Sequence, residues 1–152
     1  MSAMTSDRIT VERTIKAPAA SIFALLADAG KHREFDGSGT LRGTRQESRP
    51  LALGTRFGMA MHMGFGYRTS NEVVEFEPDR RIAWRTTGLK GLVGGRVWRY
   101  ELEPTTDGTR VSETWDVSAD RQRFFLKRSK MPAAAKNGMR KTLDRLAQTL
   151  EA

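Results

Sequence analysis

A long amphipathic pattern near the C-terminus constrains the fold more than any other feature of the chain. Residues Ala133–Glu151 contain no proline and a single glycine, and they are rich in Ala, Leu, Lys and Arg, which favour helices. Met139, Leu143, Leu146 and Leu150 recur at spacings of four, three and four, which predicts one apolar stripe on an amphipathic helix. That stripe must be buried, so the preceding chain has to supply an apolar surface.

Most of the preceding chain alternates apolar and polar residues with the period of a β-strand. A short helix is expected after the first strand, from Pro18 to Asp28, and a second helical turn at Lys31–Phe35. Short turns between consecutive strands predict an antiparallel sheet. The predicted strands are Arg8–Lys16, Thr40–Gln46, Thr55–Met63, Tyr67–Glu77, Arg81–Thr87, Arg96–Glu103 and Arg110–Val117.

Two positions do not fit simple alternation. Arg13 falls on the apolar side of the first strand, which places it either near the open end of that strand or in a polar pocket. Val73, Val74 and Phe76 are too crowded to settle which face of their strand is buried.

Length and composition indicate one ordinary domain, which we place at residues 7–152 behind a flexible N-terminus of residues 1–6. The 152 residues include no cysteine, which excludes disulfides, thiolate catalysis and cysteine-ligated metals. The first residues lack the apolar core of a signal peptide, and the longest apolar run, Ile22–Ala27, is far shorter than the ~20 residues that span a bilayer. We therefore expect a soluble, cytoplasmic protein.

Positive charge is concentrated at the C-terminal end. From Ala119 onward nine Lys and Arg residues face only three acidic ones, which accounts for +6 of the net charge of +8. A basic face of this kind is typical of proteins that meet nucleic acid or an anionic membrane surface, but the simpler interpretation, which we favour, is a solvated helix face. Nucleic acid is not an expected partner.

Several short segments of this sequence match those of a known family. They are Lys16–Pro18, Ser21–Phe23, Leu25–Asp28, Val74–Pro78, Arg81–Trp84 and Gly108–Glu113. With them the chain resembles the SRPBCC superfamily, close to its polyketide cyclase/dehydrase group, whose members include bacterial proteins. The resemblance implies an α+β helix-grip fold, in which a curved antiparallel sheet of six to seven strands wraps around the long C-terminal helix. It also implies a hydrophobic cavity between the two, which in members of the superfamily holds lipids, sterols, polyketides or hormones.

The motifs of common enzyme classes are missing. There is no Gly-x-Ser-x-Gly nucleophile elbow, no phosphate-binding loop and no His-Glu-x-x-His. A metal site of two histidines and a carboxylate would need His32 and His62 to converge, so we expect neither a metal nor a cofactor.

An apolar stripe and an aromatic cluster are the candidate ligand-binding residues. Methionine is over-represented on adaptable apolar binding surfaces, and Trp and Tyr stack on flat ligands. Both groups are equally compatible with plain core packing. The candidates are Phe57, Met59, Met61, Met63, Trp84, Trp98, Tyr100 and Trp115 on strands, with Met139 and Leu143 on the helix.

Glu113 is the candidate catalytic carboxylate because it shares the inward side of its strand with Val111 and Trp115. A buried carboxylate is costly unless it is paired, so the alternatives are a salt bridge with Arg13 or Arg99, or a place at an open rim. Tyr100 would orient the substrate or the carboxylate. His32 and Asp36, expected near the cavity mouth, are further candidates.

Three functions remain open at this point. The first is binding, transport or sequestration of a small hydrophobic ligand such as a lipid or polyketide, by a monomer or homodimer. The second is a cyclase or aromatase that uses Glu113 for proton transfer on a polyketide-like substrate. The third is a lipid- or membrane-surface module that uses the basic face of the C-terminal helix.

Overall fold

The computed structural model describes residues 6–35, 41–42, 49–62, 65–88 and 93–151. The expected flexible N-terminus lies, apart from Ser6, outside this part of the chain. The strands are β1 (Arg8–Ile15), β2 (Leu41–Arg42), β3 (Arg56–His62), β4 (Gly66–Glu77), β5 (Arg81–Gly88), β6 (Val93–Thr105) and β7 (Gly108–Asp116). The helices are α1 (Ala19–Leu26), the 3-10 turn η2 (Ala29–Lys31), α2 (His32–Phe35), α3 (Arg123–Arg128) and α4 (Met131–Glu151).

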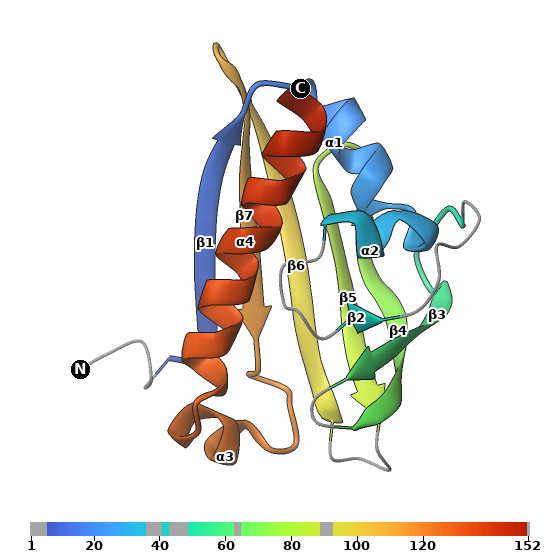
Figure 1. The fold of residues 1–152 in the computed structure, drawn as a ribbon, viewed down its shortest axis with the longest axis vertical. Coiled ribbons are helices and arrows are strands. Elements are labelled where there is room, and N and C mark those ends of the chain that lie inside the picture. The colour runs from blue at the N-terminus through green and yellow to red at the C-terminus, as the bar shows by residue number, and fades with distance from the viewer. Residues whose placement is uncertain (1–5, 36–40, 43–48, 63–64, 89–92, 152) are drawn as a thin grey trace.

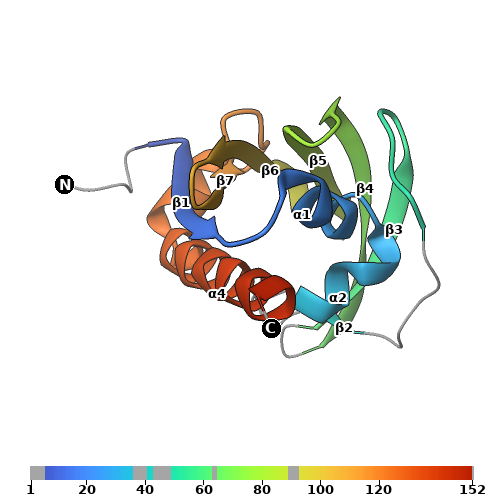
Figure 2. The ribbon, with the colours of Figure 1, turned by 90° about the horizontal axis from the view of Figure 1, so that it is seen from above.

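Within the described residues the strands form one antiparallel sheet of seven strands in the order β1-β7-β6-β5-β4-β3-β2 (Figure 1). The sheet curves, and α1, α2 and α4 all lie on its concave side, which we call the inner face (Figure 2). This arrangement confirms the α+β helix-grip fold and the two short helical segments expected after the first strand.

Helix α4 packs mainly against β1 and β7. Met139, Leu143 and Leu146 of the predicted stripe are at most 1% exposed, and Leu150 at the end of the stripe is half-buried. Burial of such side chains contributes about 1.5–3 kcal/mol each, so this stripe is a main source of stability.

A β-bulge in β4 explains the crowded apolar residues of that strand. The pairing with β5 shifts register between Val73 and Glu75, so one residue is left over on β4. As a result Val73 and Phe76 both face inward, although they are three residues apart. Phe76 contacts the ring of Phe23 on α1 edge-on, with 5.4 Å between centroids, while Glu75 turns outward.

Gly108 begins β7 in a conformation that only glycine adopts readily, with φ of +143°. A Cβ atom at this position would lie 2.2 Å from the carbonyl oxygen of Ile15. The next residue, Thr109, also holds β7 against the end of β1. Its hydroxyl donates a 2.8 Å hydrogen bond to the carbonyl of Ala17. The β6–β7 hairpin therefore closes directly onto the end of β1.

Candidate ligand-binding site

Three tryptophans lie side by side across the inner face. Trp84 of β5 pairs in register with Trp98 of β6, which pairs with Trp115 of β7. Trp84 is 5% exposed and Trp115 is 1% exposed, whereas Trp98 between them is only half-buried. The middle of this row is therefore the part that keeps contact with solvent.

The alternation predicted from sequence holds on β6 and β7. Trp98 and Trp115 lie on the inner face, whereas Arg99 and Thr114 lie on the outer face. Thr114 shares a 2.8 Å hydrogen bond with the hydroxyl of Thr10, and Arg99 pairs with Glu75 at 2.8 Å.

The other candidate lining residues divide by burial. Most belong to the core beside the tryptophans, and Met61 on β3 is half-buried, like Trp98. The side chain of Met59, and Met63 as a whole, lie outside the described residues. The buried members are Phe57, Trp84, Tyr100, Trp115, Met139 and Leu143.

His32, which is expected from sequence near the mouth of a cavity, is buried in the structure. Its side chain stacks on the ring of Trp84, with 4.8 Å between centroids, and contacts Phe35 and Phe57 edge-on. Residue exposure is only 4%. The stacking partner Trp84 is distant in sequence, so tertiary packing rather than local pattern produces this burial. Asp36, the companion candidate, lies outside the described residues.

The environment of His32 fixes its protonation state. Burial lowers its pKa to about 4, although the Leu26 carbonyl and the Asp28 carboxylate both act to raise the pKa. The ring is therefore neutral near pH 7. Nε2 lies 2.8 Å from the carbonyl oxygen of Leu26, so Nε2 carries the proton and Nδ1 is a hydrogen-bond acceptor.

Two buried ring nitrogens lack a hydrogen-bond partner within the described part of the chain. They are Nδ1 of His32, an acceptor, and Nε1 of Trp115, a donor. A buried polar atom without a partner costs about 1–3 kcal/mol, so such atoms are uncommon. Trp115 lies on β7 and His32 is stacked over β5, two strands away, which corresponds to about 10 Å at the usual strand spacing.

Glu113 and Tyr100 face each other across β7 and β6 on the inner face. They are 3% and 4% exposed, so a place at an open rim is ruled out for the carboxylate. The ion pairs of the two arginines considered as its partners go to other carboxylates. Arg13 pairs with Asp144 on α4, and Arg99 pairs with Glu75 and with Asp116.

A buried polar row, not foreseen from sequence, adjoins the tryptophans on the inner face. The hydroxyl of Thr86 donates a 2.6 Å hydrogen bond to Asn71, whose amide nitrogen donates to the carbonyl of Phe57 at 3.2 Å. Next to them Arg96 donates from Nε to Asp120 at 3.2 Å, and the side chain of Asp120 is fully buried. Strand alternation could have predicted this row. Each of its strand residues, Asn71, Thr86 and Arg96, lies two positions from an inward-facing apolar residue and therefore shares its face of the sheet.

Asp116 anchors a charged cluster on the outer face. Burial alone would raise its pKa, but hydrogen bonds from Ser118, Arg8 and Arg99 lower the pKa to about 2. The same Arg99 donates to both carboxylate oxygens of Glu75, at 3.0 and 2.8 Å. This cluster ties β4, β6, β7 and β1 together on the side away from α4.

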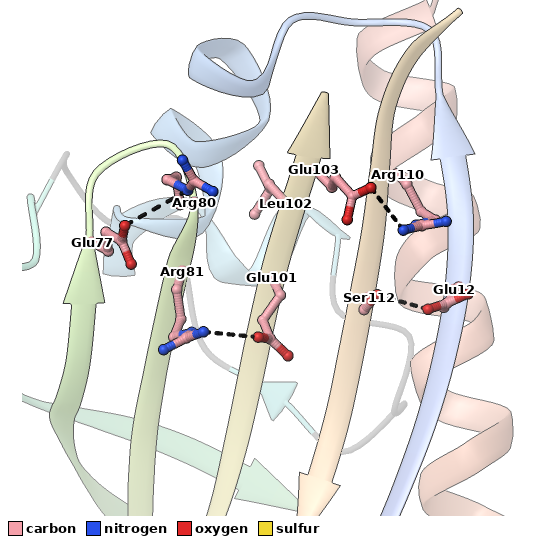
Figure 3. A pocket seen from close by; sticks show the side chains of 9 residues that line it. All are labelled: Glu12, Glu77, Arg80, Arg81, Glu101, Leu102, Glu103, Arg110 and Ser112. Atoms are coloured by element: carbon pink, nitrogen blue, oxygen red, sulfur yellow. Dashed lines mark hydrogen bonds and ion pairs between the residues drawn. The ribbon is translucent and has the colours of Figure 1, made fainter. Parts of the chain in front are cut away.

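A hollow of about 360 Å³ lies on the outer face, and its lining is almost entirely charged. Figure 3 shows its side chains paired with one another, three pairs between neighbouring strands and one at the turn that joins β4 to β5. Such a surface offers little to an apolar ligand. The pairs are Glu77 with Arg80, Arg81 with Glu101, Glu103 with Arg110, and Glu12 with Ser112.

A second hollow, of about 580 Å³, lies between β1 and α4. Its lining combines the charged residues Glu12, Arg13, Lys136, Arg140 and Asp144 with Val11 and Leu143, so it is mainly polar, although the candidate residue Leu143 borders it. Among the described residues no group of three or more His, Asp or Glu side chains could hold a metal ion. Each helix in this part of the chain is too short or too polar to span a bilayer. The inner face, which carries the row of three tryptophans, is the candidate ligand-binding site.

Comparison with known proteins places this geometry in a family. A Mycobacterium tuberculosis protein (strain ATCC 25618 / H37Rv) described as uncharacterized protein Rv0088 is 38% identical over 116 residues, which make up 74% of this chain and 48% of that protein. The chain thus spans about half the length of the curated relatives it matches.

Solved structures share the fold at low sequence identity. The solution NMR structure of a protein from Arthrobacter aurescens has a TM-score of 0.75 at 15% identity, covering 99% of this chain and 90% of that one. The crystal structure of DynU16, a protein of the dynemicin biosynthetic locus, has a TM-score of 0.68 at 20% identity, covering 97% of this chain and 48% of that one. Residues 6–151 match the family described as polyketide cyclase / dehydrase and lipid transport, and the chain belongs to that family.

Proposed function

We propose that the protein binds a small, flat, largely apolar ligand between the inner face of the sheet and helices α2 and α4. Two buried ring nitrogens that have no hydrogen-bond partner among the described residues, Nδ1 of His32 and Nε1 of Trp115, carry this assignment. A ligand lying across Trp98 would donate a hydrogen bond to the first and accept one from the second.

The chemistry of the surroundings supports an apolar ligand with few polar groups. Trp84, Trp98 and Trp115 supply ring faces for stacking, and Met61 supplies an adaptable apolar side chain. Membership of a family described by polyketide cyclases and lipid transport supports the same ligand class. A polycyclic phenol of polyketide type satisfies the flat shape and the two polar ends; transport or sequestration of such a molecule needs no catalytic group.

The test is titration of tryptophan fluorescence with anthraquinone and with a hydroxylated anthraquinone. Both are expected to quench the emission saturably, because the tryptophans line the site. The hydroxylated probe is expected to bind about 2- to 13-fold more tightly, the effect of one net hydrogen bond to Nδ1 of His32. In His32→Phe that preference should disappear while both probes still bind.

Two further variants locate the site. Met61→Trp should weaken binding of both probes by filling space at the β3 side of the inner face, whereas Leu53→Ala, at a residue 66% exposed, should change nothing. Absence of saturable quenching by either probe, with the fold intact, would refute the assignment. So would equal weakening by Met61→Trp and Leu53→Ala.

A second function, cyclisation or dehydration of a polyketide-like substrate, is favoured by one observation. Glu113 and Tyr100 lie opposite each other in the interior, where a proton-transfer group is needed. In a cyclase, Glu113→Gln should lower turnover by roughly 10²–10⁴-fold while substrate still binds. In a simple binder the same variant should leave binding of the anthraquinones nearly unchanged.

A further inference from the structure

Helix α3, which the sequence patterns did not predict, exposes two large aromatic side chains. Phe124 is 64% exposed and Phe125 is 69% exposed, whereas Leu126 beside them is 3% exposed and packs into the core. Leu126 thus anchors the short helix, and the two rings project outward. Α3 lies at the end of α4 opposite the C-terminus (Figure 1).

The surroundings of the two rings are strongly basic. Residues 121–130 contain Arg121, Arg123, Lys127, Arg128 and Lys130 and no acidic residue. Among the described residues, Lys127 is matched by Asp7 at 2.9 Å, and the nearby Asp120 is fully buried against Arg96. We call Phe124 and Phe125 with these five cations the α3 patch.

We propose that the α3 patch docks on the surface of an anionic lipid bilayer. Helices that lie in a membrane interface combine aromatic or aliphatic residues on one side with Lys and Arg, and basic residues are attracted to anionic lipids. Long cationic side chains keep their charge at the level of the headgroups while the rings enter the acyl boundary. This inference goes beyond ligand binding, because docking requires no ligand.

The geometry of Phe124 favours a membrane over nucleic acid. Cζ of Arg123 lies 4.6 Å from the ring centroid, and Nζ of Lys127 lies 5.6 Å from it. Cations thus cover at least one face of this ring, and that face is not open to a stacking base. Insertion of the ring into a bilayer interface does not require a free ring face, because the neighbouring cations can stay at the level of the headgroups.

The location of exposed apolar surface also favours α3 over the basic face of α4. The large apolar side chains that are exposed in the described part of the chain are Leu53, Phe65, Phe124 and Phe125, and none of these belongs to α4. Charge without apolar residues binds a membrane weakly and is readily solvated. The membrane-docking surface is therefore assigned to α3, with the cations of α4 as a control.

The experiment is co-sedimentation of the ligand-free protein with vesicles of phosphatidylcholine, alone or mixed with phosphatidylglycerol. The protein should bind the mixed vesicles and not the neutral ones, and 1 M salt should weaken binding by shortening the Debye length to about 3 Å. Each basic residue near an anionic surface raises partitioning about fivefold, so Arg128→Gln with Lys130→Gln should lower it about 25-fold. Phe124→Ala with Phe125→Ala should lower it roughly tenfold or more.

Two matched controls make the assignment specific. Arg140→Gln with Lys141→Gln removes two exposed cations from α4, and Leu53→Ala with Phe65→Ala removes two exposed apolar side chains elsewhere. Both controls should lower partitioning less than threefold, since a full contact by one cation is worth about fivefold. Circular dichroism and fluorescence titration with anthraquinone, without vesicles, should be unchanged in every variant.

The possible results distinguish membrane docking from nucleic-acid binding and from binding of the apolar ligand. No binding to mixed vesicles, or equal losses in α3 variants and controls, would overturn membrane docking whether or not the protein binds anthraquinone. Binding of an oligonucleotide that is lost in Phe124→Ala with Phe125→Ala, without vesicle binding, would replace the membrane by nucleic acid. Vesicle binding by a protein that does not bind anthraquinone would uphold docking and refute only the ligand site.

Discussion

The buried imidazole of His32 should make the stability of the fold depend on pH in the mildly acidic range. In the unfolded chain this residue takes up a proton near pH 6.5, whereas in the folded protein its pKa is lowered to about 4 by burial. Between these values the unfolded state binds the proton and the folded state does not. Stability should therefore fall as the pH drops from 6.5 to 4, with no contribution from His32 above this range.

The size of the effect follows from the two pKa values. The free energy of unfolding should decrease by about 1.4 kcal/mol for each pH unit within the interval, which gives about 2 kcal/mol between pH 6.5 and pH 5. Over the whole interval the loss should reach about 3 kcal/mol. The lowered pKa values of Glu75 and Asp116 act at lower pH, because their stabilisation is lost only below about 4.5 and 3.8.

The assay is urea unfolding of the wild type and of His32→Phe at pH 7, 6 and 5. Phenylalanine retains an aromatic ring to stack on Trp84 but cannot take up a proton. The variant is expected to be less stable at pH 7, because it loses the hydrogen bond to the Leu26 carbonyl. Its stability relative to the wild type should then improve by about 2 kcal/mol as the pH falls to 5.

Parallel pH profiles for the two proteins would refute this reasoning. A difference of less than about 0.5 kcal/mol in their change between pH 7 and pH 5 would mean that the imidazole is protonated in the folded state. An NMR titration of the His32 ring gives an independent measurement, and a pKa above about 6 would lead to the same conclusion.

Three other perturbations have defined outcomes. Leu143→Ala and Leu146→Ala should each lower the free energy of unfolding by about 2–5 kcal/mol, since both side chains are at most 1% exposed; losses under about 0.5 kcal/mol in urea melts would contradict the packing of α4. Gly108→Ala should lower the free energy of unfolding by more than about 2 kcal/mol, because its Cβ would collide with Ile15. Gly54→Ala, with φ of +83° and no atom near its Cβ, should lower it only by the backbone strain of about 1 kcal/mol. Equal melting temperatures of the two variants would be inconsistent with the contact between the hairpin and β1. Asp116→Asn should destabilise the protein by about 2 kcal/mol near pH 7, and the loss should vanish as the pH falls from 3.8 towards 2; a loss independent of pH in the same melts would show that the charge is irrelevant.

The fold was predictable because its elements have strong periodic patterns. The stripe on α4 and the alternation in β1, β3, β5, β6 and β7 are repeated over enough residues to outweigh local exceptions. The crowding in β4 had a definite cause, the bulge between Val73 and Glu75, but a bulge depends on the partner strand and is not visible in one strand alone. Helix α3 was missed because six residues are too few for a periodic stripe.

The site was less predictable, for reasons that are also physical. Alternation placed Trp98, Trp115 and Glu113 on the inner face, because strand parity is a local property. The burial of His32 depends on stacking against a strand that comes some fifty residues later. The ion pair of Arg96 and Asp120 joins residues 24 positions apart. The strand that contains Arg96 does not indicate which distant carboxylate will be buried beside it.

Arg13 has a consequence for the behaviour of whole molecules. It is the inward-facing residue of β1 that pairs with Asp144, and β1 is a strand at the edge of the sheet. An edge strand with an unbroken apolar side invites strands of other chains to add to it, and a charge in the middle of that side makes the addition unfavourable. A strand added at this edge would cover Arg13, which lies between Val11 and Ile15, and would take its charge partly out of water. We therefore expect the charge of Arg13 to disfavour the addition of further strands at β1.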